Sequence, residues 1–318
     1  MITNENYYSL ENSAKYMSVS QFKSFMECES KALAEIKGEY QRETTTALLV
    51  GSYVDAWFEG TLDKFKENHS EIFLKSGGLK SDYVQADEII RRVSADKQFM
   101  KYMSGEKQVI FTGNIADIQF KGKLDSYHAG KCIVDLKTVR DFEPVWKNGR
   151  KMSFIEAWGY DIQGAVYQEL VYQATGQKLP FIICAVTKEK VPDIAIISIP
   201  QEHLDFCLEI VKSEAPHFQE IKSGTLIPER CEKCDFCKIT KILPGVVDYR
   251  DLNPELFKHE TSEHDEETPV TVRSIAENLP DISEKEPLVN FEKPKKKHKK
   301  HKKRKEHKKD NNVIIIKI

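Results

Sequence analysis

The apolar residues follow a helical spacing over the first hundred positions and a strand-like alternation after them. Residues three or four positions apart share one face of a helix, whereas alternate residues share one face of a strand. The helical spacing predicts three helices, over residues 18–36, 45–67 and 81–103. The alternation predicts the three strands of an antiparallel meander, over residues 107–113, 115–127 and 131–139.

The following segments continue the mixture of helices and strands. We expect a helix over residues 153–174, strands over 180–188 and 193–200, and a closing helix over 201–224. This order of elements predicts an α/β (α+β) domain, in which helices flank a central mixed sheet that contains the antiparallel meander.

Charge is distributed unevenly along the 318 residues, although the net charge is only -2. Residues 248–292 carry 13 acidic and 4 basic side chains, whereas residues 293–318 carry 2 acidic and 13 basic ones. We therefore divide the chain into a folded domain (1–247), an acidic disordered linker (248–292) and a Lys/His-rich basic tail (293–318). No stretch has the roughly 18 apolar residues of a membrane span, and the N-terminus lacks secretory features, so we expect a cytoplasmic protein without membrane contact.

Charged residues interrupt the strand-like hairpin that ends the predicted meander. If residues 128–130 form a three-residue loop, Asp125, Asp135 and Lys137 lie on one face of the hairpin. A two-residue loop would instead place the two carboxylates on opposite faces. Two adjacent carboxylates raise each other's pKa unless a cation lies between them, and Mg²⁺ prefers such oxygen ligands. The D-x-K pattern by itself is also compatible with an ordinary solvated hairpin face.

Further motifs around this hairpin form a longer pattern: G-x-x-D, then D-x-K, then Q-x-x-x-Y on a predicted helix. The residues that carry it are Gly122, Asp125, Asp135, Lys137, Gln163 and Tyr167. The pattern resembles the PD-(D/E)XK nuclease superfamily in its RecB-like branch, and within it the RecE-like (exodeoxyribonuclease VIII) nuclease domains of phages. In the preceding G-x-x-x-H motif of this branch, Asp55 stands where the histidine is usual.

The resemblance implies a restriction-endonuclease-like core and a DNA exonuclease that uses Mg²⁺ or Mn²⁺ and resects duplex ends for recombination. Asp55, Asp125 and Asp135 would be metal ligands, and Lys137 would be the catalytic lysine. Two further residues, Gln163 and Tyr167, would brace the site or contact the DNA backbone. The duplex DNA end is then the principal partner. A single-strand annealing protein and a second copy of the chain are further partners that such a role would involve.

Three cysteines at the end of the folded domain, Cys231, Cys234 and Cys237, are too closely spaced for ordinary core packing, and Cys28 is a candidate fourth member. Thiolates bind zinc and iron–sulfur clusters alike. One cysteine before the core and three after it resemble the [4Fe–4S] nucleases of the AddAB and CRISPR-adaptation types, although the trailing spacing here is shorter. A [4Fe–4S] cluster and Zn²⁺ are therefore both candidates, in a structural role, and free or partly buried thiols are the alternative.

Basic side chains follow the proposed catalytic strand. We expect Lys147, Arg150 and Lys151 to contact DNA phosphates, and an ordinary solvated loop is the alternative interpretation. Two other interpretations stay open beside the recombination exonuclease. One is a non-catalytic RecB-like module that binds DNA, and the other is an iron–sulfur nuclease of the CRISPR or repair type.

Overall fold

The computed structural model describes residues 2–243, 245–253 and 256. The chain divides into two units, and the described residues of the first unit run up to Lys238. Within the second unit, the described residues include a 3-10 turn, η2, at Tyr249–Leu252. Most of the predicted acidic linker and all of the predicted basic tail lie outside the described residues, so these two predictions stay untested. None of the described helices is long and apolar enough to cross a bilayer.

The N-terminal part is helical as predicted, but each of the three expected helices is divided into two. Its elements are α1 (Leu10–Lys15), α2 (Val19–Glu27), α3 (Glu29–Lys37), α4 (Thr46–Phe58), α5 (Leu62–Asn68), η1 (Ser70–Ile72), α6 (Ser81–Ser94) and α7 (Lys97–Tyr102). The break between α2 and α3 falls at Cys28, whose backbone is extended with φ −167°. After α4, Gly60 adopts φ 73°, a left-handed conformation that favours glycine. Asp96 separates α6 from α7 and caps α7 by accepting a hydrogen bond from the Phe99 N–H.

The strands form two sheets and a separate hairpin. The first sheet has the order β1-β3-β2, the second is mixed with the order β4-β5-β8-β9, and β6 pairs with β7. The strands are β1 (Met17–Ser18), β2 (Val109–Ile115), β3 (Ile118–Leu124), β4 (Ser126–His128), β5 (Cys132–Val139), β6 (Val145–Lys147), β7 (Arg150–Met152), β8 (Phe181–Thr187) and β9 (Ile194–Ser198). The later helices are α8 (Phe154–Ala157), α9 (Tyr160–Thr175), α10 (Gln201–Ser223) and α11 (Asp235–Ile239).

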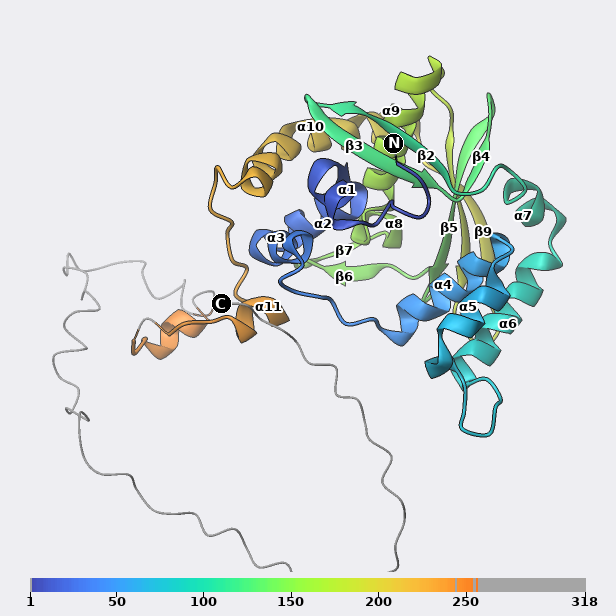
Figure 1. Ribbon diagram of the computed structural model, residues 1–318, viewed down its shortest axis with the longest axis horizontal. Helices are drawn as coiled ribbons and strands as arrows, with labels where there is room; N and C mark the ends of the chain where they lie inside the picture. Colours follow the sequence, from blue (N-terminus) through green and yellow to red (C-terminus); the bar gives the residue numbers. More distant parts are fainter. Residues whose placement is uncertain (1, 244, 254–255, 257–318) are drawn as a thin grey trace, which may run out of the picture. The chain divides into compact units, whose positions relative to one another are not determined.

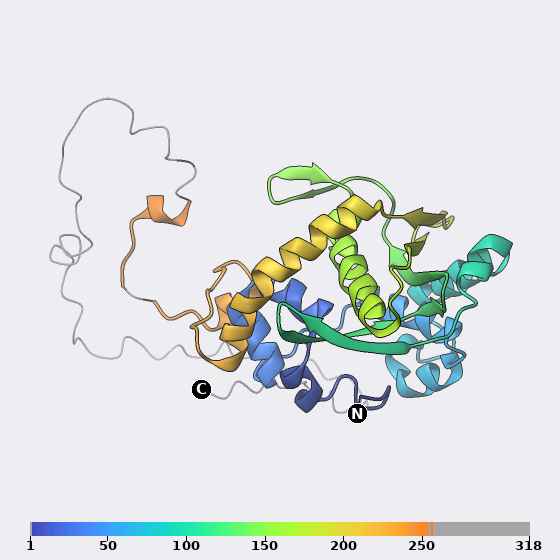
Figure 2. The ribbon, with the colours of Figure 1, turned by 90° about the horizontal axis from the view of Figure 1, so that it is seen from above.

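The mixed sheet is covered by helices on both faces, as the element order predicts. On β5, Val134 and Leu136 belong to a hydrophobic cluster with residues of α4 and α6. Ile133 belongs to a second cluster on the other face, together with residues of α9 and α10. Figure 1 shows α4, α5 and α6 on one side of β5, and Figure 2 shows α9 and α10 next to each other. The prediction of an α/β fold with a mixed sheet is confirmed, and the arrangement is that of a restriction-endonuclease-like core.

The expected antiparallel meander differs in two details. Its strands are divided between the two sheets, because the chain leaves the strand conformation at Asp125, between β3 and β4. The side-chain oxygen Oδ2 of Asp125 accepts a hydrogen bond from the Leu136 N–H at 2.9 Å, so a side chain replaces the backbone partner there. The hairpin loop has the predicted length of three residues but occupies residues 129–131, since His128 pairs with Cys132. An odd loop length still leaves alternate residues on the predicted faces.

Candidate active site and cysteine centre

The acidic residues singled out in the sequence line one cavity of about 660 Å³. Asp125 lies at the break between β3 and β4, and Asp135 lies in the middle of β5. Asp55 is contributed by α4, one turn after Gly51. A Cβ atom at Gly51 would lie 3.1 Å from Thr138 Oγ1, so the glycine allows α4 to approach the end of β5 closely. The cavity is also lined by Lys137, Gln163 and Tyr167.

Asp135 is the most constrained of these carboxylates, since its exposed fraction is 2%. Gln163 Nε2 donates a hydrogen bond to its Oδ1 at 2.7 Å. Lys137 Nζ lies 2.5 Å from its Oδ2 as an ion pair. Among the described residues, nothing donates a hydrogen bond of regular geometry to this Oδ2, although the atom is buried. The Lys137 ammonium group thus compensates the charge of this buried oxygen, which is also an acceptor that a bound metal cation would satisfy.

The pKa shifts of charged residues in the cavity also favour a bound cation. Burial, together with the charge of Asp135, raises the pKa of Asp125 to about 7. Burial and the charge of Asp125 also raise the pKa of Asp55. Burial lowers the pKa of Lys137, but the neighbouring Asp135 and Asp125 outweigh this effect and hold its pKa above the ordinary value. A cluster of three carboxylates, in which the pKa values of Asp55 and Asp125 are raised, forms a donor set for a hard divalent ion such as Mg²⁺ or Mn²⁺.

Close packing between β3 and α9 fixes the geometry of the cavity. A Cβ atom at Gly122 would lie 2.9 Å from two ring carbons of Tyr167, so only glycine leaves room for this ring. Tyr167 is buried, and one turn before it Gln163 reaches Asp135. The spacing of four residues places both side chains on one face of α9, where Gln163 contacts Asp135 and Tyr167 packs against Gly122 of β3.

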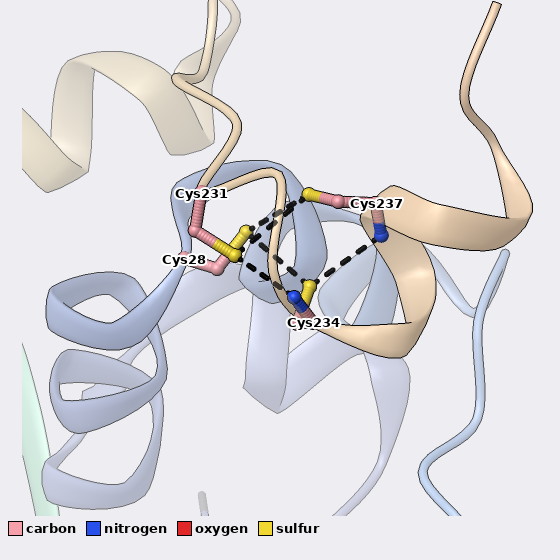
Figure 3. Close-up of side chains that lie close together, drawn as sticks. All are labelled: Cys28, Cys231, Cys234 and Cys237. Carbon is pink, nitrogen blue, oxygen red and sulfur yellow. Dashed lines mark hydrogen bonds between the residues drawn. The ribbon is translucent and has the colours of Figure 1, made fainter. Parts of the chain in front are cut away.

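The four predicted cysteines come together at the end of the domain (Figure 3). Cys28 Sγ lies 3.6 Å from Cys237 Sγ and 3.8 Å from Cys234 Sγ, and Cys231 Sγ lies 3.9 Å from Cys237 Sγ. The backbone N–H groups of Cys234 and Cys237 donate to the sulfurs of Cys231 and Cys234. Four sulfurs at about 2.3 Å from one tetrahedral zinc ion would lie about 3.8 Å apart. The distances therefore fit a single ion.

The charge state of these thiols also favours a bound cation. Burial raises the pKa of Cys28, and burial also raises the pKa of Cys234 to about 12. Burial opposes the ionisation of Cys231 as well, but hydrogen bonds from the backbone of Lys233 and Cys234 lower its pKa to about 6. A bound metal cation would stabilise the thiolate forms that burial disfavours at Cys28 and Cys234.

The predicted DNA-contacting residues lie on the β6–β7 hairpin. Lys147 and Arg150 line a second cavity, of about 1090 Å³, whereas Lys151 does not. In the register of the hairpin, Lys151 pairs with Trp146. Lys147 Nζ lies 5.1 Å from the ring centroid of Trp158, which also lines this cavity. Two of the three basic residues therefore face a groove with an aromatic wall.

Sequence reasoning missed two lysines of the first cavity, Lys121 and Lys123 on β3. They flank Gly122 in the G-x-x-D motif, and their spacing of two places both side chains on one face of the strand. Tyr7 and Tyr8 of the N-terminal segment line the same cavity. The alternation in "FKGKLD" indicates that the two lysines share one face of the strand, whereas no local pattern indicates that the two tyrosines line the cavity.

The fold and the cavity define the class of this protein as a PD-(D/E)XK nuclease. The model of one family, described as PDDEXK-like domain of unknown function (DUF3799), matches residues 18–240, and the chain belongs to that family. A crystal structure from Eubacterium rectale, provisionally described as that of an exonuclease, is similar at 46% identity with a TM-score of 0.77. The match covers 80% of this chain and 98% of that one. No curated protein matches the chain. The prediction of the superfamily is thereby confirmed.

Proposed function

We propose that this protein is a Mg²⁺- or Mn²⁺-dependent DNA exonuclease that degrades duplex ends. The observation that carries the proposal is the convergence of Asp125, Asp135 and Lys137 on one cavity, in which a buried Asp135 oxygen is paired with the Lys137 ammonium group. Support for exonuclease rather than endonuclease activity comes from the description of the E. rectale protein, which is 46% identical to this chain.

In the proposed mechanism, Asp125 and Asp135 would hold the divalent ion, and Asp55 would be a third ligand in place of the usual histidine. When bound, the ion supplies Lewis-acid activation of the scissile phosphate and of the attacking water. Gln163 fixes the orientation of Asp135 through its hydrogen bond to Oδ1. Lys137 stays protonated, because its pKa is raised, so it donates hydrogen bonds and offsets the negative charge that develops on the phosphate.

The cysteine centre has a structural role in this proposal. Its sulfur distances of 3.6–3.9 Å favour one zinc ion over a [4Fe–4S] cluster, whose four irons must fit between the sulfurs. Such an ion would tie Cys28, at the break between α2 and α3, to the segment that follows α10. It lies among thiols only, so it leaves no carboxylate or water position for catalysis.

The biological setting follows from the reaction. An exonuclease that removes one strand from a duplex end leaves a single strand, onto which an annealing protein can load. We therefore propose that the protein resects duplex DNA ends for phage-type recombination, with an annealing protein as a proposed partner. A homo-oligomer would keep the enzyme on its substrate between successive cuts. Lys147, Arg150 and Lys151 are proposed contacts for the DNA backbone.

The test uses linear duplexes labelled at each end, with covalently closed circles as the control for endonuclease activity. With Mg²⁺, the wild type should shorten the linear DNA, leave the circles intact and lose activity in EDTA. Asp135→Asn should reduce the rate by a factor on the order of 100 or more, whereas Asp82→Asn, at an exposed position on α6, should leave it unchanged. Equal rates for wild type and Asp135→Asn, or no DNA degradation by the wild type, would overturn the proposal in favour of a non-catalytic DNA-binding module.

A further inference from the structure

Two lysines share the cavity with the acids but form no close ion pair in the described part of the chain, although the charge of Glu59, which lines the same cavity, acts on Lys123. Lys121 and Lys123 lie on β3 and line the cavity together. Neither forms an ion pair with an acidic residue in the part of the chain that the structure describes. Lysines are almost never fully buried unless they are paired, so Lys121, which is buried without an ion pair in the described chain, indicates an anionic ligand.

Lys121 is the more deeply buried of the two, with an exposed fraction of 2%. Its Nζ donates a hydrogen bond to the backbone oxygen of Tyr7 at 2.5 Å and lies 4.6 Å from the centroid of the Tyr7 ring. These neutral partners satisfy one donor and leave the charge uncompensated. Burial accordingly lowers the pKa of Lys121 to about 8. An anion bound in the cavity would compensate the positive charge of Lys121.

Aromatic rings from the N-terminal segment lie over the second lysine. Lys123 Nζ lies 5.4 Å from the ring centroid of Tyr7 and 4.9 Å from that of Tyr8. The side chain of Tyr8 is nevertheless exposed, at 75%. An exposed aromatic ring beside a cation in a nuclease cavity has the two properties that nucleotides recognise, a stacking surface for a base and a charge for a phosphate.

We propose that Lys121 and Lys123 bind a phosphate group of the DNA strand that is cut, next to the scissile phosphodiester, and that the Tyr8 ring stacks on the adjoining base. This inference rests on the proposed nuclease function and adds a substrate subsite to it. The acids of the cavity would hold the cation at the reacting phosphate, while the lysines would hold the neighbouring one. The ammonium group of lysine is a compact positive charge, so it can bind either a terminal phosphate or an internal phosphodiester.

The decisive measurement is the salt dependence of DNA binding, in EDTA so that no cleavage occurs. Each lysine–phosphate contact contributes about 0.7–0.9 to the slope of log K against log salt concentration. Lys123→Gln should lower the slope by this amount and weaken binding about tenfold at low salt. Lys123→Arg should restore the slope because it keeps the charge. Lys75→Gln, at an exposed loop position that lines neither cavity, should match the wild type.

Duplexes with 5′-phosphate, 5′-hydroxyl and 3′-phosphate ends then identify the source of the phosphate. An effect of Lys123→Gln on one end type only assigns a terminal phosphate, and an equal effect on all of them assigns an internal one. Tyr8→Ala should weaken binding about tenfold through lost stacking, whereas Tyr8→Phe should bind as the wild type does.

A different result would assign the lysines to a merely structural role. If they only hold the N-terminal tyrosines, Lys123→Gln will lower the melting temperature and leave the salt slope unchanged, and the inference is wrong. This outcome is separate from a failure of the proposed function. A wild type that degrades DNA while Lys123→Gln keeps the full slope refutes the subsite alone, whereas a wild type without activity refutes the nuclease assignment.

Discussion

The buried ion pair between Lys137 and Asp135 should determine the stability of the protein without metal as well as its activity. The exposed fractions of the two side chains are 17% and 2%, and Nζ lies 2.5 Å from Oδ2. Lys137→Met keeps the length of the side chain but removes its charge. Removing one partner of a buried ion pair lowers the free energy of unfolding by about 3–5 kcal/mol, because the remaining charge is buried without compensation. For a domain of this size, that loss lowers the melting temperature by roughly 6–20 °C.

The matched control is Lys178→Met, which removes a lysine from an exposed ion pair with Asp205. That pair has a similar distance, 2.6 Å, but its side chains are 43% and 50% exposed. Exposed pairs contribute about 0–1 kcal/mol, so this variant should unfold close to the wild-type temperature. Thermal and urea unfolding in EDTA would measure both variants, and the end-labelled duplex assay would show that only Lys137→Met abolishes cleavage.

Metal and pH give two further signatures of the same charge imbalance. Added Mg²⁺ should raise the melting temperature of Lys137→Met more than that of the wild type, because the variant has more uncompensated negative charge for the ion to bind. Asp125 has a folded-state pKa of about 7, above its unfolded value, so a rise in pH destabilises the folded state. Removal of Lys137 strengthens this effect, and the deficit of the variant should be larger at pH 8 than at pH 5.5. Equal unfolding of Lys137→Met and Lys178→Met under all conditions would refute the reasoning.

Two further substitutions test the packing and the cysteine centre. Gly122→Ala places a Cβ atom 2.9 Å from the Tyr167 ring, which should cost about 1–3 kcal/mol and reduce cleavage by displacing the strand before Asp125. Gly78→Ala, where no atom lies within 4 Å, is the control, and equal melting temperatures would contradict the packing argument. Cys237→Ser should lose about one zinc ion per chain by elemental analysis, whereas Cys132→Ser, outside the cluster, should retain it. Four irons with sulfide in the wild type would show that the centre is a cluster instead.

The placement of the acids was accessible from the sequence because it depends on local periodicity. Alternation along β5 puts Asp135 and Lys137 on one face, and it survives the displacement of the hairpin loop by one residue because the loop length stays odd. Likewise, the four-residue spacing on α9 predicts that Gln163 and Tyr167 lie on one side of the helix. Each of these inferences needs only the conformation of one element, which the hydrophobic pattern supplies.

The features that could not be predicted depend on contacts between distant segments. Tyr7 lies 114 residues before Lys121, and no pattern near either residue indicates that they meet. The break between helices α2 and α3 at Cys28 also depends on a contact with a distant segment. Helical spacing continues across this position, but the extended backbone there brings the thiol to Cys237, which lies 209 residues later. Local propensity favours one continuous helix, and the tertiary contact decides against it.

The break at Asp125 links the fold to the chemistry of the site. A continuous strand from β3 into β4 would give Leu136 a backbone hydrogen-bond partner and would leave no side chain at that position to accept from its N–H. In this chain the Asp125 carboxylate accepts that hydrogen bond with one oxygen, Oδ2, while the two sheets separate on either side of it. The same side chain lines the cavity that it shares with Asp135. The residue that ends the strand is thus also the residue that supplies negative charge, so the cavity and its proposed metal ligand arise from one interruption of the strand pairing.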